Sequence, residues 1–166
     1  MHKIFSQEDY NENDKLGKKY ALEVAAHRGW NCVDSDEHKS KFDLLLSKNG
    51  KQILVEAEVR DDPRNNFDNI GSKWNTIHVP ERKGKTASEK KQLADFFLTF
   101  RKDGKFFWEV KMAYAIKFPV VQILCKRNNE DWEDDIHNVK IDRKNVKKFQ
   151  VIRGSGGNIV GVRKIL

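Results

Sequence analysis

The sequence contains only two cysteines, only three prolines and no long run of apolar residues. Cys32 and Cys125 do not form a CxxC pair, so the sequence predicts two buried free thiols in a reducing compartment, without a disulfide or a metal site. No stretch approaches the roughly 20 apolar residues that a membrane span requires, and the first residues lack the apolar run of a signal peptide. We therefore expect a cytoplasmic protein that has no membrane partner.

Linkers and internal repeats are missing as well. No Pro/Ser-rich segment divides the chain, and the only low-complexity piece is the short glycine-rich run at 154–157. The chain has 166 residues, of which 38% are hydrophobic and 34% charged, and this is an ordinary size and composition for one domain with an adequate core. The sequence therefore predicts a single domain over residues 1–166.

Positive charge exceeds negative charge. The chain has 32 Lys and Arg residues against 25 Asp and Glu residues, which gives a net charge of +7 at pH 7. An excess of this sign favours a polyanionic partner, because contacts to phosphates release counterions. Many basic proteins bind no polyanion, so charge by itself leaves a nucleic-acid partner open.

Periodicity and turn residues predict a mixed α/β fold with a central sheet. A helix is expected from residue 13 or 14 to residue 28, with Gly29 as its C-terminal stop. Three strands should follow, and the pair Asn49-Gly50 between the second and the third is a strong hairpin signal. These strands are expected at 30–33, 42–47 and 52–60.

The remaining residues are predicted to add one short helix and several strands. The helix is expected at 64–73, and the strand after it at 75–79 ends at a proline. Residues 96–110 are interpreted as a hairpin of two strands, in preference to a helix over 88–101. Further strands are expected at 120–125, 139–141, 149–153 and 159–162, the last two as a C-terminal hairpin.

Acidic residues gather on one face of the predicted strand 52–60. Side chains alternate across a strand, so Glu56, Glu58 and Arg60 share one face and the intervening apolar residues share the other. The hairpin can bring Asp43 beside Glu56 or Glu58, and such a cluster of like charges usually persists because a cation neutralises it. Oxygen-only ligands favour Mg²⁺ or Mn²⁺. The competing interpretation is that both glutamates only line the solvent side of an amphipathic strand.

Four stretches resemble, in this order, the start of a PD-(D/E)xK nuclease domain. They are KKYALEVA at 18–25, GWNCV at 29–33, FDLLL at 42–46 and ILVEAEVR at 53–60. The resemblance covers residues 14–83 and implies a restriction-endonuclease-like αβββαβ core with a mixed central sheet, to which residues 84–166 add strands and C-terminal β-hairpins. It also implies a Mg²⁺-dependent endonuclease that hydrolyses phosphodiester bonds in DNA.

The same resemblance implies the site residues. By position in the motif, Glu23 is the acid of the first helix, Asp43 the first metal ligand and Glu56 the second. Glu58 stands where the family has lysine, and it can serve as a further metal ligand or as a general base. Some restriction endonucleases of this superfamily carry (D/E)-x-E and remain active.

The glutamate in place of the motif lysine reverses the charge at that position. A displaced cation can supply the missing charge, either Arg60 on the same face or Lys83 after the next strand. The alternative is a catalytically inactive nuclease fold that binds nucleic acid or a protein partner through its basic surface.

Basic residues are frequent between positions 73 and 91, directly after the acidic strand. This pattern suits phosphate contacts, although a solvated lysine-rich loop would give the same pattern. The acidic run at 130–135 is expected to face away from phosphate. The sequence does not determine the oligomeric state. A homodimer is possible, because double-strand cleavage often uses symmetric dimers. The expected nucleic-acid-binding residues are Arg60, Lys73, Arg82, Lys83 and Lys85.

Overall fold

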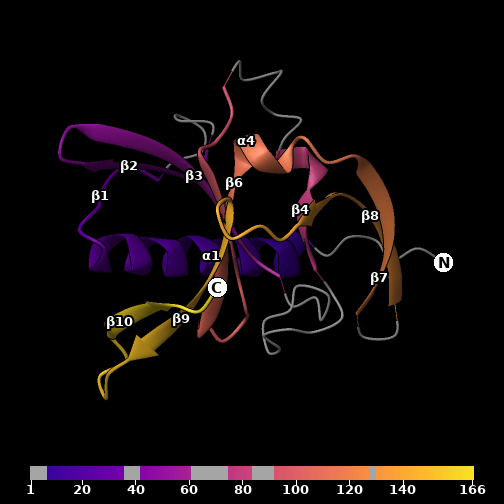
Figure 1. The fold of residues 1–166 in the computed structure, drawn as a ribbon. Coiled ribbons are helices and arrows are strands. Elements are labelled where there is room, and N and C mark those ends of the chain that lie inside the picture. Colours follow the sequence, from indigo (N-terminus) through magenta and orange to yellow (C-terminus); the bar gives the residue numbers. More distant parts are fainter. Residues whose placement is uncertain (1–6, 36–41, 61–74, 84–91, 128–129) are drawn as a thin grey trace.

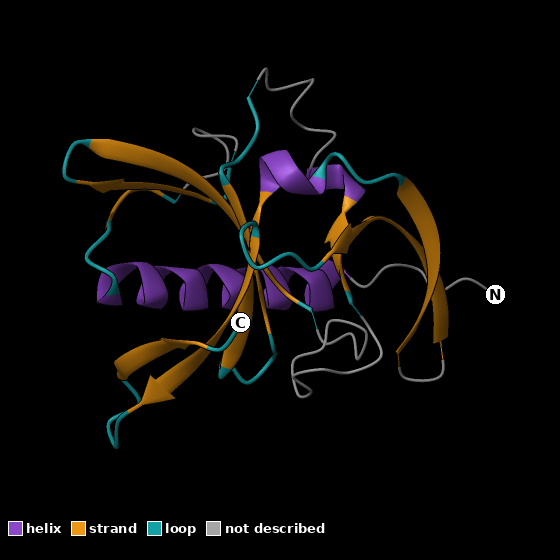
Figure 2. Cartoon of the chain, viewed as in Figure 1, coloured by secondary structure: helices purple, strands orange, loops and turns teal. Residues whose placement is uncertain are grey.

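The computed structural model describes residues 7–35, 42–60, 75–83, 92–127 and 130–166, without the side chains of 7–11 and 125–132. The predicted helix at 64–73 and the residues Lys73 and Lys85 lie outside this part of the chain. The described elements form a mixed α/β fold, in which one long helix accompanies strands that make up most of the structure (Figure 2).

The long helix is α1, Gln7–His27, and it begins earlier than predicted. It ends as predicted at Gly29, which has a φ of 80° and donates from its backbone N–H to the carbonyl of Ala26. A left-handed residue at this place favours glycine, which has no Cβ to clash with the helix end. The chain then turns back toward the sheet.

The larger of the two sheets has the strand order β1-β2-β3-β5-β6-β9-β10 (Figure 1). All neighbours are antiparallel except β3 and β5, which are parallel. The predicted turn joins β2 to β3, and Asn49 and Gly50 both have positive φ, as a two-residue hairpin turn requires. The strands are β1 Asn31–Asp34, β2 Leu44–Lys48, β3 Lys51–Val59, β5 Phe96–Phe100, β6 Phe106–Lys111, β9 Val146–Arg153 and β10 Ile159–Lys164.

The other two predicted hairpins are confirmed as well. Residues 96–110 form the antiparallel pair β5 and β6 and not a helix, and β9 pairs with β10 around the glycine-rich turn. β5 and β6 each contain two neighbouring phenylalanines and few helix-favouring residues. They form strands and not a helix because aromatic residues pack well on a pleated surface.

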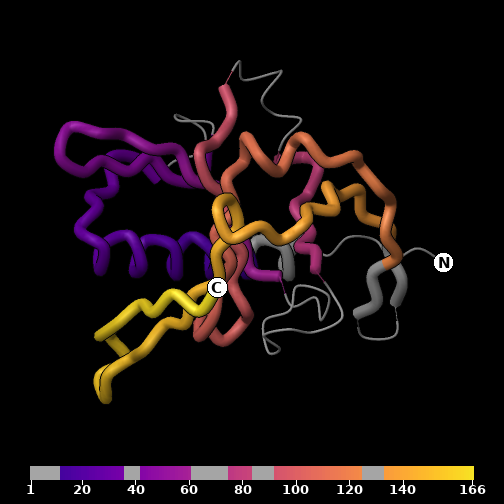
Figure 3. Tube along the Cα trace, viewed as in Figure 1, coloured from indigo at the N-terminus to yellow at the C-terminus, as the bar shows by residue number. Residues whose placement is uncertain are grey.

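A second sheet has the order β4-β8-β7 and corrects the expected topology. The strand predicted at 75–79 was expected in the central sheet, but it forms β4, Thr76–Pro80, at the edge of this second sheet. Its place beside β3 is taken by β5. The chain returns to the second sheet through the short helix α4, Met112–Ala115, and continues as β7, Val120–Arg127, and β8, Glu130–Lys140, as Figure 3 traces.

The larger sheet is covered on both faces. As predicted, Ile53, Val55, Ala57 and Val59 share one face of β3, where they pack with the apolar residues of α1. Leu54 is on the other face and packs with Ile77 and Val79 of β4. Glu56 and Glu58 lie on this second face and are 3% and 8% exposed, so the solvent-side interpretation of these residues is wrong. The second sheet explains their burial.

Cys32 is a free cysteine but an exposed one, because β1 is an edge strand whose residues lie mostly at the surface, so its predicted burial is wrong. Cys125 belongs to the residues whose side chains are not described. Within the described ranges, no helix is both long and apolar enough to cross a membrane.

Candidate active site

Two buried carboxylates and one lysine meet at the junction of the two sheets. Asp43 directly precedes β2, and the hairpin pairs Leu44 with Val55, which brings Asp43 to the part of β3 that carries Glu56. Nζ of Lys83 lies 2.6 Å from Oε2 of Glu56 and 3.1 Å from Oδ2 of Asp43. The predicted approach of Asp43 to Glu56 is therefore confirmed, and so is the reach of Lys83.

Lys83 comes from the end of β4 and not from β3. Residues 81–83 are helical and directly follow Pro80, the last residue of β4. Because β4 packs against the face of β3 that carries the acids, a residue three positions beyond its end reaches across to them. The side chain of Lys83 is only 11% exposed. A cation thus stands beside the acids although β3 has glutamate in the motif position.

The protonation states of the three groups depend on one another. Burial raises the pKa of Glu56 to about 7, against the opposing effect of the Lys83 ammonium. Burial would also raise the pKa of Asp43, but Lys83, the hydrogen bond from Glu56 and the backbone N–H of Ala57 together lower it. The charges of Asp43 and Glu56 outweigh burial at Lys83 and raise its pKa. Near neutral pH, Asp43 and Lys83 are therefore charged, while Glu56 is protonated in part of the molecules.

A further acid and a further lysine reach this cluster from α1. Nζ of Lys18 lies 3.6 Å from Oδ1 of Asp43 and 3.3 Å from Oδ2 of Asp14. Burial raises the pKa of Asp14, and the negative charge of Asp43 raises it further. From the sequence, Asp14 was expected only as one of two possible first residues of the helix. The spacing of four residues between Asp14 and Lys18 was the signal that both lie on one face of the helix.

The structure does not bring Glu23 to the acid cluster. Its Oε2 accepts from Arg153 in β9 at 2.6 Å. Glu23 lies nine residues after Asp14, which is about 14 Å along the axis of α1. Glu23 therefore lies apart from Asp43 and Glu56, whereas Asp14 of the same helix lies near Asp43.

Glu58 lies between two arginines. Its Oε2 accepts from Arg82 at 2.8 Å, and its Oε1 lies 3.4 Å from Arg60. Arg60 also donates to Oδ2 of Asp134 in β8 at 2.7 Å. The acidic run at 130–135 was expected to face away from phosphate. One of its residues, Asp134, instead lies beside the arginine that contacts Glu58.

α1 crosses β3 at the level of the candidate site. A Cβ atom added to Gly17 would lie 2.7 Å from Cα of Glu58, so only glycine allows this approach of helix and strand. Gly17 therefore sets the distance at which α1 presents Asp14 and Lys18 to Asp43.

The residues present offer oxygen ligands to a metal ion but do not form a finished cage. Asp43 and Glu56 are adjacent and Asp14 is near them, which is a donor set of the kind that Mg²⁺ and Mn²⁺ bind. Within the described part of the chain, no group of three or more Asp, Glu, His or Cys side chains is arranged to hold a metal. The Lys83 ammonium lies against both Asp43 and Glu56, and Glu58 is turned to its arginines.

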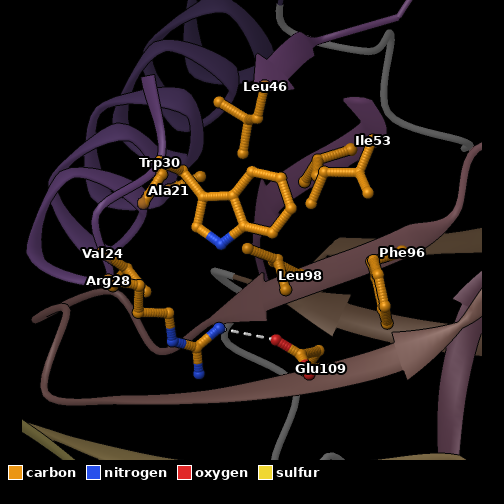
Figure 4. A pocket seen from close by; sticks show the side chains of 11 residues that line it. Ala21, Val24, Arg28, Trp30, Leu46, Ile53, Phe96, Leu98 and Glu109 are labelled. Atoms are coloured by element: carbon orange, nitrogen blue, oxygen red, sulfur yellow. Dashed lines mark hydrogen bonds and ion pairs between the residues drawn. The ribbon is translucent and has the colours of Figure 1, made fainter. Parts of the chain in front are cut away.

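A separate cavity lies between α1 and the larger sheet, at the other end of the helix. Its volume is about 180 Å³, and Figure 4 shows Trp30, Leu46, Ile53 and Leu98 around it. An ion pair of 2.7 Å between Arg28 and Glu109 borders it. Its lining residues do not include those of the acid cluster.

Comparison of the chain with protein-family models, with curated proteins and with solved structures found no significant match. A function is therefore inferred below from the residues and their geometry alone.

Proposed function

We propose that this protein is a metal-dependent endonuclease of the PD-(D/E)xK type that hydrolyses phosphodiester bonds in DNA. The observation that carries the proposal is the contact of Lys83 with both Asp43 and Glu56, at 3.1 and 2.6 Å. The sequence predicted the two acids, but the motif position of the lysine holds Glu58. Lys83, which comes from another element, supplies the cation beside the two acids. Its position favours the hypothesis that the catalytic lysine has moved to another element over the hypothesis that it has been lost.

The arrangement of the strands supports the αβββαβ core as part of this proposal. α1 packs on β3, β1 to β3 form an antiparallel meander, and β5 lies parallel to β3. In this proposal β5 takes the role of the last core strand, which was expected at residues 75–79. Parallel neighbours require a long crossover connection, and the 36 residues between Val59 and Phe96 provide it.

Asp43 and Glu56 would hold Mg²⁺ or Mn²⁺, with Asp14 as the nearest further acid. The metal, when bound, would act as a Lewis acid on a phosphodiester and would lower the pKa of a bound water. Lys83 remains cationic and can donate hydrogen bonds to a phosphate oxygen or to the attacking water. Metal ligands must be deprotonated, so Glu56, whose pKa burial raises to about 7, would bind the metal more readily as the pH rises above neutral.

A second candidate function is a catalytically inactive module that binds nucleic acid or a protein partner. The observation that favours it is burial, because Asp43 and Glu56 are 2% and 3% exposed and already contact a cation. Buried ion pairs of this kind also occur as purely structural features. Salt-sensitive DNA binding without cleavage in any divalent metal would support this candidate.

The proposal is tested by incubating the purified protein with supercoiled plasmid in Mg²⁺, in Mn²⁺ and in EDTA. Asp43→Asn and Glu56→Gln keep the shapes of the side chains and remove their charges. Asp103→Asn is the matched control, since Asp103 is an exposed acid in the turn between β5 and β6. We expect metal-dependent nicking by the unmodified protein and the control, and none by the other two variants. Equal nicking by all four proteins would refute the site.

A further inference from the structure

Glu58 is bound by guanidinium groups and not by the other acids. It lies two residues after Glu56 on the same face of β3, about 7 Å along the strand. Its two oxygens meet different arginines, Arg82 at 2.8 Å and Arg60 at 3.4 Å. A carboxylate held in this way is an acceptor for charge-assisted hydrogen bonds, and it is less available as a metal ligand or as a base.

The two arginines differ in their surroundings. Arg60 is 12% exposed in its side chain and is tied to Asp134 of the second sheet at 2.7 Å. The side chain of Arg82 is 47% exposed. Arg60 and Asp134 therefore fix Glu58 from the protein side, while Arg82 presents about half of its surface to solvent.

Arg82 is also the neighbour of Lys83 in the chain. Lys83 contacts Asp43 and Glu56, and Arg82 contacts Glu58, so one short helical segment after β4 places two cations along the acidic face of β3. A planar guanidinium presents five N–H donors, and its fork geometry matches the oxygens of a phosphate. An anion that approaches the acid cluster from solvent would meet this group.

We propose that Arg82 contacts a backbone phosphate of the nucleic acid beside Asp43 and Glu56, and that Glu58 is a positioning residue that orients Arg82. This inference rests on the proposed function, because it assumes a phosphodiester substrate. It assigns Glu58 a different role from the metal ligand or general base that the motif implies. It also explains the glutamate in place of lysine, since the acid holds a cation that another element supplies.

The test measures binding of a short fluorescent DNA duplex by anisotropy in EDTA, over a series of salt concentrations. Arg82→Ala should weaken binding about tenfold and should reduce the magnitude of the salt slope by about 0.9, as expected for the loss of one phosphate contact. Glu58→Gln should give a smaller loss of affinity and a smaller reduction of the salt slope. The double variant should bind like Arg82→Ala alone, because Glu58 acts through Arg82. Arg82→Lys should restore the salt slope but only part of the affinity.

Arg143→Ala is the matched control, since Arg143 is exposed in the turn before β9, and it should leave affinity and slope nearly unchanged. Thermal unfolding of every variant separates loss of binding from loss of fold. An unchanged salt slope in folded Arg82→Ala would overturn the inference. A Glu58→Gln variant that binds DNA normally but needs far more Mn²⁺ for plasmid cleavage would also overturn it, in favour of a metal ligand. Absence of DNA binding by the unmodified protein would instead overturn the proposed function, and this inference with it.

Discussion

Removal of the Lys83 ammonium should destabilise the protein in a manner that depends on pH. Lys83→Met keeps most of the side-chain length and leaves Asp43 and Glu56 buried without their shared cation. Breaking a buried ion pair by removal of one partner costs about 3–5 kcal/mol of unfolding free energy. Lys18→Met is the matched control, because Lys18 is 20% exposed and lies 3.6 Å from Asp43. The control should lose about 1 kcal/mol or less.

The sign of the pH effect follows from Glu56. Its pKa is about 7 in the folded chain against an ordinary value of 4.5, so the folded state binds this proton more tightly than the unfolded state does. The unfolding free energy therefore falls as the pH rises from 4.5 to 7, by about 3 kcal/mol in all. Without Lys83 the pKa of Glu56 rises further. The loss caused by Lys83→Met should then be about 1 kcal/mol smaller at pH 5.5 than at pH 8.

Urea unfolding followed by tryptophan fluorescence at both pH values measures these quantities. The combination of Lys83→Met with Glu56→Gln should recover part of the stability at pH 8, because it removes the charge that lost its partner. An equal loss at both pH values, or a loss below about 1 kcal/mol at pH 8, would refute the electrostatic account of the cluster.

Three further changes test other parts of the structure. Gly17→Ala should cost about 1–3 kcal/mol, because the added methyl meets the backbone of Glu58 and α1 must move away; an unchanged urea midpoint would contradict this close approach. Asp134→Asn should cost about 1 kcal/mol through the weakened contact with Arg60, and equal stability by the same assay would count against that contact. Cys32 should react with a maleimide in the folded protein, faster as the pH rises because the thiolate is the reactive form and partial burial raises the pKa of the thiol; labelling that requires urea would contradict its exposure.

Local signals in the sequence were sufficient for the elements that build the acidic strand. Gly29 as the end of α1, the Asn49-Gly50 turn and the alternation along β3 each depend on a few neighbouring residues. The hairpin then determined that Asp43 would approach Glu56, because pairing register follows from the turn. This part of the site was therefore predictable.

The contributions of distant elements were not predictable in the same way. β4 was recognised as a strand, but its place in a second sheet depends on tertiary packing against Leu54, and that packing buries the acids. Asp134 reaches Arg60 because β8 pairs with β4, across more than fifty residues of sequence. Asp14 was not predicted, because the motif pattern places the helix acid at Glu23. The crossing of α1 over β3 at Gly17 and the contact of Lys18 with Asp43 show which end of the helix faces Asp43.

The most direct test of the account is a calorimetric titration of the purified protein with Mn²⁺ at pH 8, beside the Asp43→Asn and Glu56→Gln variants. Unlike a cleavage assay, it does not depend on the choice of substrate. The account predicts one saturable site in the unmodified protein, its loss in both variants and retention in the Asp103→Asn control. The absence of any saturable binding by the unmodified protein, or equal binding by all four proteins, would contradict the claim that these two acids hold a divalent metal.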